Sequence, residues 1–507
     1  MEIISKTKKQ SEYDMSTWIR CCEEEVKKPI QGKVSGTIPS WLNGALLRNG
    51  SGTHKVGSSE FGHVFDGPAF LHRFHMKNGA VTYQCRYLNT ETLKKNRKAN
   101  RIVVTEFGTK SVPDPCHSIF DRISSTFTLD DYFTDNAGIS VQPFGDQIYT
   151  MTEIATVYRI DPESLETIER KSLLNSLIVC HTAHPHVLPN GDVYNIGLQF
   201  VMGFPKHVIV KFPYSAKANM FESAEVVGVV DPKWRFNPSY MHSFGITENY
   251  YIIIEQPLCI STLKTMKKII FNEPFSTMLE WYSDYETTLI LVHRITGKQT
   301  RYRADTFFFM HIINCFEKND QLYIDVASYK DAKMINAMYI DAIKNMDRNP
   351  SYGEWYHSRP KRIEIDLRSP PNSKAETLLL TDVGVEVPRI NYEAYNGRPY
   401  RYFYGISLEV QTEHAGSIIK VDNKTGEIKT WREIDSYPSE PVFVASPDAK
   451  EEDDGVLLSA VLWGKDDHAV TLLVLNARDL TEVGRSHFTT PSQAPRCFHG
   501  WYLPETK

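Results

Sequence analysis

Short apolar stretches separated by polar turns dominate the chain. Runs rich in Val, Ile, Tyr, Phe and Thr are interrupted by turn residues about every ten positions, which is the pattern of strands joined by hairpins. An apolar strand, a polar turn and a second strand recur at four places: 157–167, 289–298, 418–428 and 472–481. We predict a strand hairpin at each of them.

Hairpins spread over the whole chain predict one repeated antiparallel unit. A chain of 507 residues favours a β-propeller over a β-sandwich, because sandwich domains rarely exceed about 250 residues. No linker divides the sequence, so residues 16–507 are expected to form a single domain, and the polar residues 1–15 are expected to be disordered. Helical patterns are few: 341–346 predicts a short helix, with 331–339 before it.

Composition narrows the class of protein. Hydrophobic residues make up 41% and charged residues 23%, as in ordinary globular proteins, and the formal net charge of −5 argues against nucleic acid as a partner. No apolar run reaches the roughly 18 residues of a membrane span. The eight cysteines follow neither a zinc-binding nor a disulfide pattern, so we expect a reducing, cytoplasmic setting.

Three of the 17 histidines share one sequence context. His184, His242 and His311 each precede a polar turn and an apolar strand, at intervals of 58 and 69 residues. Equivalent positions in successive propeller blades face the central axis, so the three are expected to meet there. His499 lies 188 residues further on, close to three more such intervals. Four imidazoles suit Fe, Cu, Zn or Ni, and an octahedral metal would keep two positions open.

Each of these histidines also has a simpler interpretation. A single histidine beside apolar residues is more often hydrogen-bonded in the core or at the surface than bound to a metal. His186, two residues after His184, is interpreted as such a structural group or as a partner of a ligand. Carboxylates in apolar, strand-like sequence could accept a hydrogen bond from metal-bound imidazoles, although each alone resembles an edge carboxylate; the candidates are Glu153, Glu386 and Glu440.

Short motifs follow one another along the chain in a fixed order. They are Leu47-Arg-Asn-Gly50, Phe65-Asp-Gly67 with Leu71-His-Arg-Phe74, Ala183-His-Pro-His186, His242-Ser-Phe-Gly245, Tyr437-Pro-Ser-Glu-Pro441, Glu452-Asp-Asp-Gly455 and Phe498-His-Gly500. Together they make the chain similar to the carotenoid cleavage oxygenase family over nearly its whole length. Ser51 departs from the Pro of many relatives, at a turn with no catalytic role.

The resemblance implies a fold and a site. The expected fold is all-β, a seven-bladed β-propeller with a cap of helices and loops over the active-site face. The resemblance implies Fe²⁺ on the axis, bound by His184, His242, His311 and His499. It also implies that three of these are oriented by Glu153, Glu386 and Glu440. Thr152 corresponds to a small side chain beside an open coordination position, and Phe107 and Tyr329 correspond to pocket positions beside the polyene.

The resemblance also implies an activity. The segments 101–108 and 113–120 are similar to animal members, and 311–316 and 497–502 to insect members that couple cleavage to isomerisation. These enzymes use O₂ to cut the central double bond of a carotenoid, such as β-carotene or zeaxanthin. They release two retinal-type aldehydes, one of them in the 11-cis form.

Three other functions are compatible with the same ligands. A retinyl-ester isomerohydrolase shares the fold and the iron but uses no O₂. Another oxygenase could cut the carotenoid eccentrically. A propeller could also bind carotenoid without reacting, although the presence of all four histidines and all three glutamates argues against this.

A membrane-bound substrate implies a membrane-facing surface. A basic cluster at 94–98 with Arg101 precedes apolar positions of helical spacing at Ile119, Phe120, Ile123 and Phe127, and 263–271 has a similar character. We predict peripheral attachment through loops near 109–127, 196–204 and 260–275. The alternative is a solvated charge run beside a core helix. Cys116 is either acylated or a plain buried cysteine.

Overall fold

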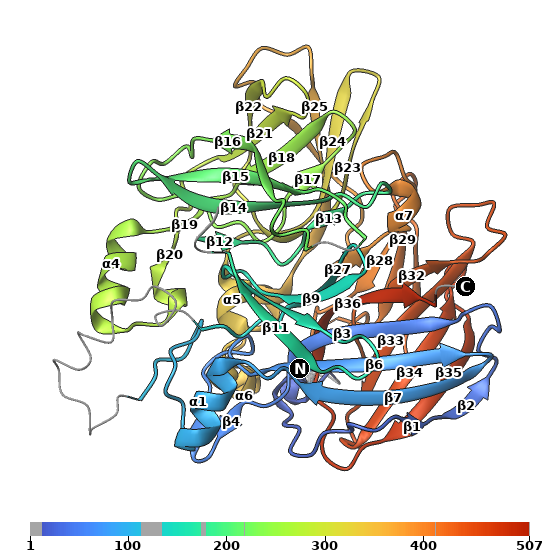
Figure 1. Cartoon of the computed structure of the whole chain (residues 1–507). Helices are drawn as coiled ribbons and strands as arrows, with labels where there is room; N and C mark the ends of the chain where they lie inside the picture. The colour runs from blue at the N-terminus through green and yellow to red at the C-terminus, as the bar shows by residue number, and fades with distance from the viewer. Residues whose placement is uncertain (1–12, 113–133, 174–178, 217–218, 411, 506–507) are drawn as a thin grey trace, which may run out of the picture.

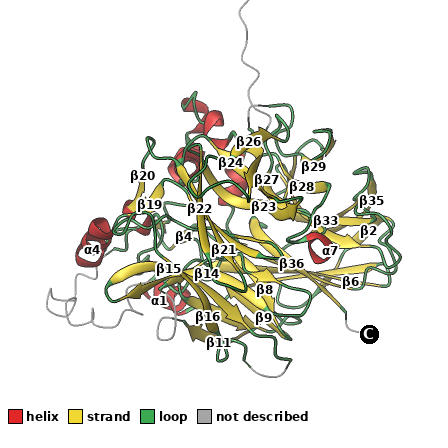
Figure 2. Ribbon diagram, turned by 90° about the horizontal axis from the view of Figure 1, so that it is seen from above, coloured by secondary structure: helices red, strands yellow, loops and turns green. Residues whose placement is uncertain are grey.

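Seven antiparallel sheets form a ring around one axis (Figures 1 and 2). The computed structural model describes residues 13–112, 134–173, 179–216, 219–410 and 412–505, and within these residues seven sheets have four or more strands. Each sheet is one blade of a propeller. The predicted all-β, seven-bladed architecture is therefore confirmed.

The first three blades hold the N-terminal half of the ring and the last strand of the chain. Blade 1 contains, from the axis outward, β36 (Cys497–Pro504), β3 (Gly44–Ser51), β6 (Ala69–Lys77), β7 (Ala80–Tyr87) and β1 (Ile30–Gln31). Blade 2 contains β8 (Ser140–Phe144), β9 (Gln147–Met151), β10 (Thr156–Ile160) and β11 (Thr167–Ser172). Blade 3 contains β12 (Cys180–His181) and β13 (His186–Val187) at the axis, then β14 (Val193–Val201), β15 (Phe204–Phe212) and β16 (Glu225–Val230).

The other four blades follow in chain order. Blade 4 contains β17 (Gly245–Ile246), β18 (Tyr250–Glu255), β21 (Thr287–His293) and β22 (Gln299–Ala304). Blade 5 contains β23 (Phe308–Lys318), β24 (Gln321–Tyr329), β25 (Arg359–Asp366) and β26 (Glu376–Leu379). Blade 6 contains β27 (Glu386–Arg389), β28 (Tyr402–Ile406), β29 (Ile418–Asp422) and β30 (Ile428–Trp431). Blade 7 contains β31 (Ser436–Pro438) and β32 (Val442–Ala445), then β33 (Gly455–Trp463), β34 (Ala469–Asn476), β35 (Glu482–Thr489) and β2 (Lys33–Gly36).

Strands from both ends of the chain close the ring. The C-terminal β36 pairs with β3 in blade 1, and the N-terminal β2 pairs with β35 in blade 7. Closure of this kind leaves only short sheet edges exposed and fixes the innermost strands around the axis. The four hairpins expected from the sequence are confirmed as β10–β11, β21–β22, β29–β30 and β34–β35.

Apolar side chains pack between neighbouring blades. Leu289 and Leu291 of blade 4 are fully buried in one cluster with Leu322 and Ile324 of blade 5. Because alternate residues of a strand face opposite sides of a sheet, one strand contributes to the cores on both of its sides. Ile290 and Val292 accordingly pack in the adjoining cluster with residues of blade 3. Burial between blades makes the ring rigid enough to hold side chains at its axis.

The helices gather mainly on one side of the ring (Figure 1). They are η1 (Met15–Ile19), α1 (Glu91–Ala99), α4 (Thr262–Phe271), η3 (Phe275–Met278), α5 (Lys333–Ala337), α6 (Ile340–Lys344), η4 (Met346–Arg348) and η5 (Gly353–Tyr356), while α7 (Tyr392–Tyr395) lies elsewhere. Two short hairpins, β4 (Lys55–Val56) with β5 (Ser59–Glu60) and β19 (Leu258–Ile260) with β20 (Leu279–Trp281), join this cap. The two predicted helices are confirmed as α5 and α6. Every helix in the described part of the chain is too short or too polar to cross a bilayer.

Two expected boundaries and one expected loop differ in the structure. Within 260–275, which the sequence predicts to be a loop, Thr262–Phe271 form the helix α4. Tyr13 and Met15 are buried, so ordered chain begins before residue 16. The segment 196–204 was expected to be a loop, but it belongs to the β14–β15 hairpin, whose turn is at Met202 and Gly203. Its alternation of apolar residues continues that of the strands, and this is why the chain stays extended there. Most of the predicted loop 109–127 lies outside the described residues.

Candidate metal centre

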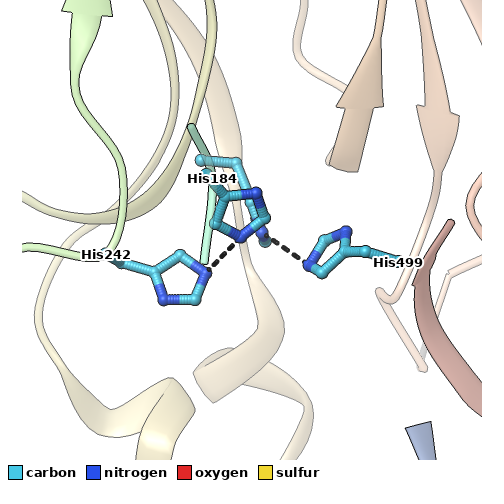
Figure 3. A group of neighbouring side chains, drawn as sticks. His184, His242 and His499 are labelled. Atoms are coloured by element: carbon cyan, nitrogen blue, oxygen red, sulfur yellow. Dashed lines mark hydrogen bonds between the residues drawn. The ribbon is translucent and has the colours of Figure 1, made fainter. Parts of the chain in front are cut away.

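Four histidines converge at the axis from the innermost strands of four blades. His184 lies between β12 and β13, His242 precedes β17, His311 lies within β23, and His499 lies in β36. Their possible ligand atoms are all within 4.8 Å of one another. The Nε2 atoms of His184 and His242 are 3.0 Å apart, and those of His311 and His499 are 3.3 Å apart (Figure 3 labels His184, His242 and His499).

The local setting of the histidines differs from the sequence-based expectation. The shared sequence context predicts one common position for the three in their strands, but His311 is the fourth residue of β23 and His184 lies in an interruption between two short strands. Irregular pairing near residues 309–312 turns the His311 side chain toward the axis. Thr182 helps to fix His184, because its Oγ1 accepts a hydrogen bond of 3.2 Å from the His184 amide.

Three carboxylates hold three of the imidazoles. The Nδ1 atoms of His242, His311 and His499 lie 2.5 Å from Glu153, 2.7 Å from Glu386 and 2.8 Å from Glu440, respectively. Among the described residues His184 has no such carboxylate. The structure thus brings together all four predicted histidines and all three predicted glutamates. Each Nδ1–H donates to its carboxylate, and this fixes the tautomer that leaves Nε2 with a lone pair.

The facing lone pairs fit a bound cation. His311 and His499 both use their N–H at Nδ1, so their two Nε2 atoms, 3.3 Å apart, face each other as acceptors. A metal with bonds of about 2.1 Å to imidazole at right angles would place neighbouring nitrogens about 3.0 Å apart. The observed separations agree with that geometry, so the donor set can hold a metal ion.

Burial keeps the imidazoles in the form that binds metal. It lowers the pKa of His184 well below its ordinary value, with neighbouring histidines lowering it further. Burial also lowers the pKa of His242, and it lowers that of His499 to about 4 although Glu440 acts in the opposite direction. These side chains are therefore neutral near neutral pH, and neutral imidazole is the ligand form.

Two cavities meet at the four histidines. The axial cavity, about 100 Å³, is enclosed by inner-strand and α7 residues that include Gln142, Asn314, Arg389, Tyr392, Asn396 and Trp501. The cap cavity, about 70 Å³, lies beneath η1, α5 and η5 and is lined by Phe65, Met334, Met338, Ile406, Leu408 and Phe498. His311, His499, Val387 and Glu440 border both. The axial cavity also has apolar lining residues such as Ile312 and Ile390, so the metal position has one side of mixed polarity and one mainly apolar side.

Val387 separates the two cavities with an unusual backbone. Its φ of 45° is rare for a β-branched residue and is accompanied by irregular pairing between Glu386 and Arg389. In this conformation its amide donates a 2.9 Å hydrogen bond to the Glu386 carboxylate that holds His311. Backbone strain of this kind persists only where surrounding structure enforces it, and it often marks a functional site.

The remaining predicted site residues lie around this centre. Thr152 is half-buried between β9 and Glu153. Phe107 is half-buried against Phe65, with ring centres 5.7 Å apart, and Phe65 contacts Phe498 at 5.5 Å. Tyr329 is buried in β24, where burial and the charge of Glu386 raise the pKa of its hydroxyl. Phe107 and Tyr329 thus lie beyond the residues that line the cap cavity, and the roles of all three stay predictions.

His186 does not join the four histidines. Its Nε2 lies 2.9 Å from the carbonyl of Phe244, and its Nδ1 lies 3.1 Å from the hydroxyl of Tyr392. The structural interpretation of this residue agrees with these contacts. Sequence reasoning missed two arginines at the site, Arg48 and Arg389, although an arginine within the apolar motif Leu47-Arg-Asn-Gly50 is a signal of a buried ion pair.

Residues 19–504 match the protein family described as Retinal pigment epithelial membrane protein. The chain belongs to this family. The carotenoid isomerooxygenase of Galleria mellonella is 54% identical over 97% of either chain, and that of Drosophila melanogaster is 41% identical over 96% of this chain and 92% of its own. The β,β-carotene 15,15'-dioxygenase of Gallus gallus is 35% identical over 97% of this chain and 98% of its own.

Solved structures show the same fold. A variant of the Synechocystis apocarotenoid oxygenase superposes with a TM-score of 0.80 at 22% identity, covering 98% of this chain and 100% of the other. The cobalt-substituted form of that oxygenase superposes with a TM-score of 0.79 at 22% identity, over 98% of this chain and 100% of the other. The resemblance to the carotenoid cleavage oxygenases is confirmed by these relatives and by the family match.

Proposed function

We propose that this chain is an iron(II)-dependent dioxygenase that cleaves the central double bond of a carotenoid and isomerises one product. The substrate would be β-carotene or a xanthophyll such as zeaxanthin, and the products two retinal-type aldehydes, one in the 11-cis form. The convergence of four imidazoles beside an apolar cavity carries this proposal. The identity to carotenoid isomerooxygenases supports it.

Iron is the metal that the family resemblance favours among those that suit imidazole donors. Bound at His184, His242, His311 and His499, Fe²⁺ would supply the activation of O₂. Glu153, Glu386 and Glu440 hold three ligands in the required tautomer. Thr152 is proposed to lie beside an open coordination position.

The cap cavity would orient the polyene and exclude water. Its aliphatic and aromatic side chains suit a hydrocarbon chain, and Phe65 links it to Phe107. We assign Phe107 the role of stabilising transient positive charge on the polyene during isomerisation, because aromatic faces attract cations. Tyr329 is proposed to shape the same pocket from the side of Glu386.

Product analysis under ¹⁸O₂ tests the proposed reaction. Purified protein loaded with Fe²⁺ is incubated with β-carotene, zeaxanthin or a retinyl ester, and the products are separated by chain length and isomer. The expected result is ¹⁸O-labelled retinal-type aldehyde, part of it 11-cis. Unlabelled 11-cis retinol from the ester would instead indicate an isomerohydrolase, longer apocarotenals an eccentric cut, and unchanged carotenoid a binding protein.

We also propose that the protein is cytoplasmic and attaches to a membrane surface beside the cap. Exposed apolar side chains cluster on the β14–β15 turn and on α4: Met202 is 94% exposed, Leu263 73% and Phe271 62%. The turn and α4 lie on the same side in Figures 1 and 2. Phe236 links them, because its ring lies 6.0 Å from that of Phe204 and its carbonyl accepts a hydrogen bond from Thr262. Apolar side chains gathered in this way suit insertion at a lipid interface.

Liposome flotation tests this attachment. Replacement of Met202, Leu263 and Phe271 by serine should abolish flotation with vesicles containing anionic lipid. The matched control replaces Ile295 and Ile434 by serine, because these are also strongly exposed but lie on other loops. Equal flotation of the triple variant and the control would refute the proposed surface. The predicted contributions of Ile119 and Phe120 lie outside the described residues.

A further inference from the structure

The three carboxylates that hold the histidines have different electrostatic partners. Glu153 accepts a 2.6 Å hydrogen bond from the hydroxyl of Tyr240, and Glu386 accepts one from the Val387 amide. Within the described residues neither forms an ion pair with lysine or arginine. Glu440 differs, because two arginines reach its carboxylate.

Arg389 makes the closer of these two contacts. Its Nε donates a 2.8 Å hydrogen bond to Oε1 of Glu440, the same oxygen that accepts from His499 Nδ1 at 2.8 Å. Its Nη2 donates to the carbonyl of Gly500 at 2.7 Å. Glu440 is 2% exposed, so water does not screen the pair appreciably. Arg48 is fully buried on the other side, 3.4 Å from Oε2 of Glu440.

β27 supplies both Arg389 and Glu386. The irregular pairing between these two residues separates them, so that Glu386 reaches His311 while Arg389 borders the axial cavity and reaches Glu440. One strand therefore supplies His311 with Glu386, a carboxylate that has no lysine or arginine partner within the described residues. The same strand supplies Arg389, whose positive charge compensates the carboxylate that holds His499. Burial alone would raise the pKa of Glu440, but Arg389, His499 and Arg48 hold it well below its ordinary value.

We infer that Arg389 is a positioning residue whose charge offsets that of Glu440. As a result, His499 donates electron density to the metal more weakly than His242 and His311 do. This inference rests on the proposed iron site. A divalent ion, three carboxylates, two arginines and four neutral imidazoles sum to one positive charge. Without Arg389 the sum is zero, and the lower charge favours the trivalent ion. Arg389 thus stabilises the divalent state.

The charge of Arg389 affects the metal more than its hydrogen bond to Glu440 does. Without Arg389, the carboxylate would still accept from His499 Nδ1 and, at 3.0 Å, from the Gly500 amide, and Arg48 would remain beside it. A hydrogen bond from His499 to a less neutralised carboxylate makes the imidazole a stronger donor. Removal of Arg389 should therefore change the metal's preferred charge while the histidine stays in place.

Redox titration of the iron-loaded protein tests this inference. Ferricyanide takes one electron from each Fe²⁺, giving Fe³⁺ and ferrocyanide, and the Fe³⁺ is measured by electron paramagnetic resonance. In Arg389→Met the ratio of ferric to ferrous protein at a fixed potential should rise about tenfold, which corresponds to a midpoint lower by about 59 mV. Arg389→Lys restores the charge without the second hydrogen bond and should return to within about twofold of the unaltered protein.

The controls separate this role from a structural one. Arg362→Met removes a comparable half-buried arginine from Asp325 in blade 5 and should leave the midpoint unchanged. An unchanged midpoint in Arg389→Met, or equal changes in the Met and Lys variants, would overturn the inference while the iron proposal stands. If the unaltered chain binds no Fe²⁺, the proposed function and the inference both fail.

Discussion

The cap cavity and the axial cavity share His311 and His499 but differ in polarity: the cap cavity is apolar almost throughout, whereas the axial cavity mixes polar residues with apolar ones such as Ile312 and Ile390. Side chains such as Met334, Ile406 and Leu408 line the first, whereas Asn314, Arg389 and Asn396 border the second. The cap cavity lies between inner strands and the cap helices, which add apolar side chains such as Met334, while the axial cavity is bordered by residues of the inner strands and of α7. The metal position thus has one side suited to a hydrocarbon substrate and another suited to charge control. The two sides can be altered separately.

Loss of a histidine that binds the metal should have the largest effect on iron content and activity, because the metal position borders both cavities. His184→Ala is expected to reduce bound iron from about one ion per chain to a trace and to abolish cleavage, because His184 completes the donor set. Metal analysis and product assay measure this. His186→Gln, two residues away but bonded to Phe244 and Tyr392, should keep its iron. Equal iron loss in both variants would refute the assignment of ligands.

Replacement of Glu386 should have the next largest effect, on the affinity for Fe²⁺. Glu386→Gln removes the charge that supports His311 and is expected to weaken Fe²⁺ binding about 10- to 100-fold. Competition with a chelator measures the affinity. Glu409→Gln is the matched control, because Glu409 is equally buried but pairs with Arg359. Unchanged affinity in Glu386→Gln would show that this carboxylate has no role in metal binding.

Substitution of Phe107 tests whether the cap side of the metal position, and not the axial side, controls the isomer of the product. Phe107→Leu is expected to lower the ratio of 11-cis to all-trans product several-fold, with iron content unchanged, because it removes an aromatic face near the polyene. Tyr392→Phe, which alters the axial cavity, should leave the ratio unchanged. Chromatography of the products measures both. An unaltered ratio in Phe107→Leu would contradict the charge-stabilising role.

His186, which lines the axial cavity, should make the stability of the folded protein modestly dependent on pH. Burial lowers its pKa from 6.5 to about 4, so between these pH values the unfolded chain binds a proton that the folded chain excludes. Stability from this group is complete above pH 6.5 and is lost as the pH falls toward 4. His186→Gln should reduce the slope of unfolding free energy against pH by up to one proton in this window. A slope in His186→Gln equal to that of the unaltered protein would contradict the prediction.

Strand periodicity and short motifs were enough to predict the repeating architecture and most of the residues of the site. Strand and turn periodicity is local, so hairpins such as 418–428 could be predicted within about ten residues. The common context of His184, His242 and His311 indicated a shared axis. The membership of His499 and the choice of iron came from the family resemblance.

The way in which these residues meet depends on contacts between strands that are distant in the sequence. His499 reaches the other ligands because β36 closes blade 1 against β3, a pairing between the two ends of the chain. The left-handed backbone of Val387, the Arg389–Glu440 ion pair and the two unlike cavities depend on contacts between blades. Local patterns fix which face of a strand is buried, but packing among distant strands decides which buried charges face one another.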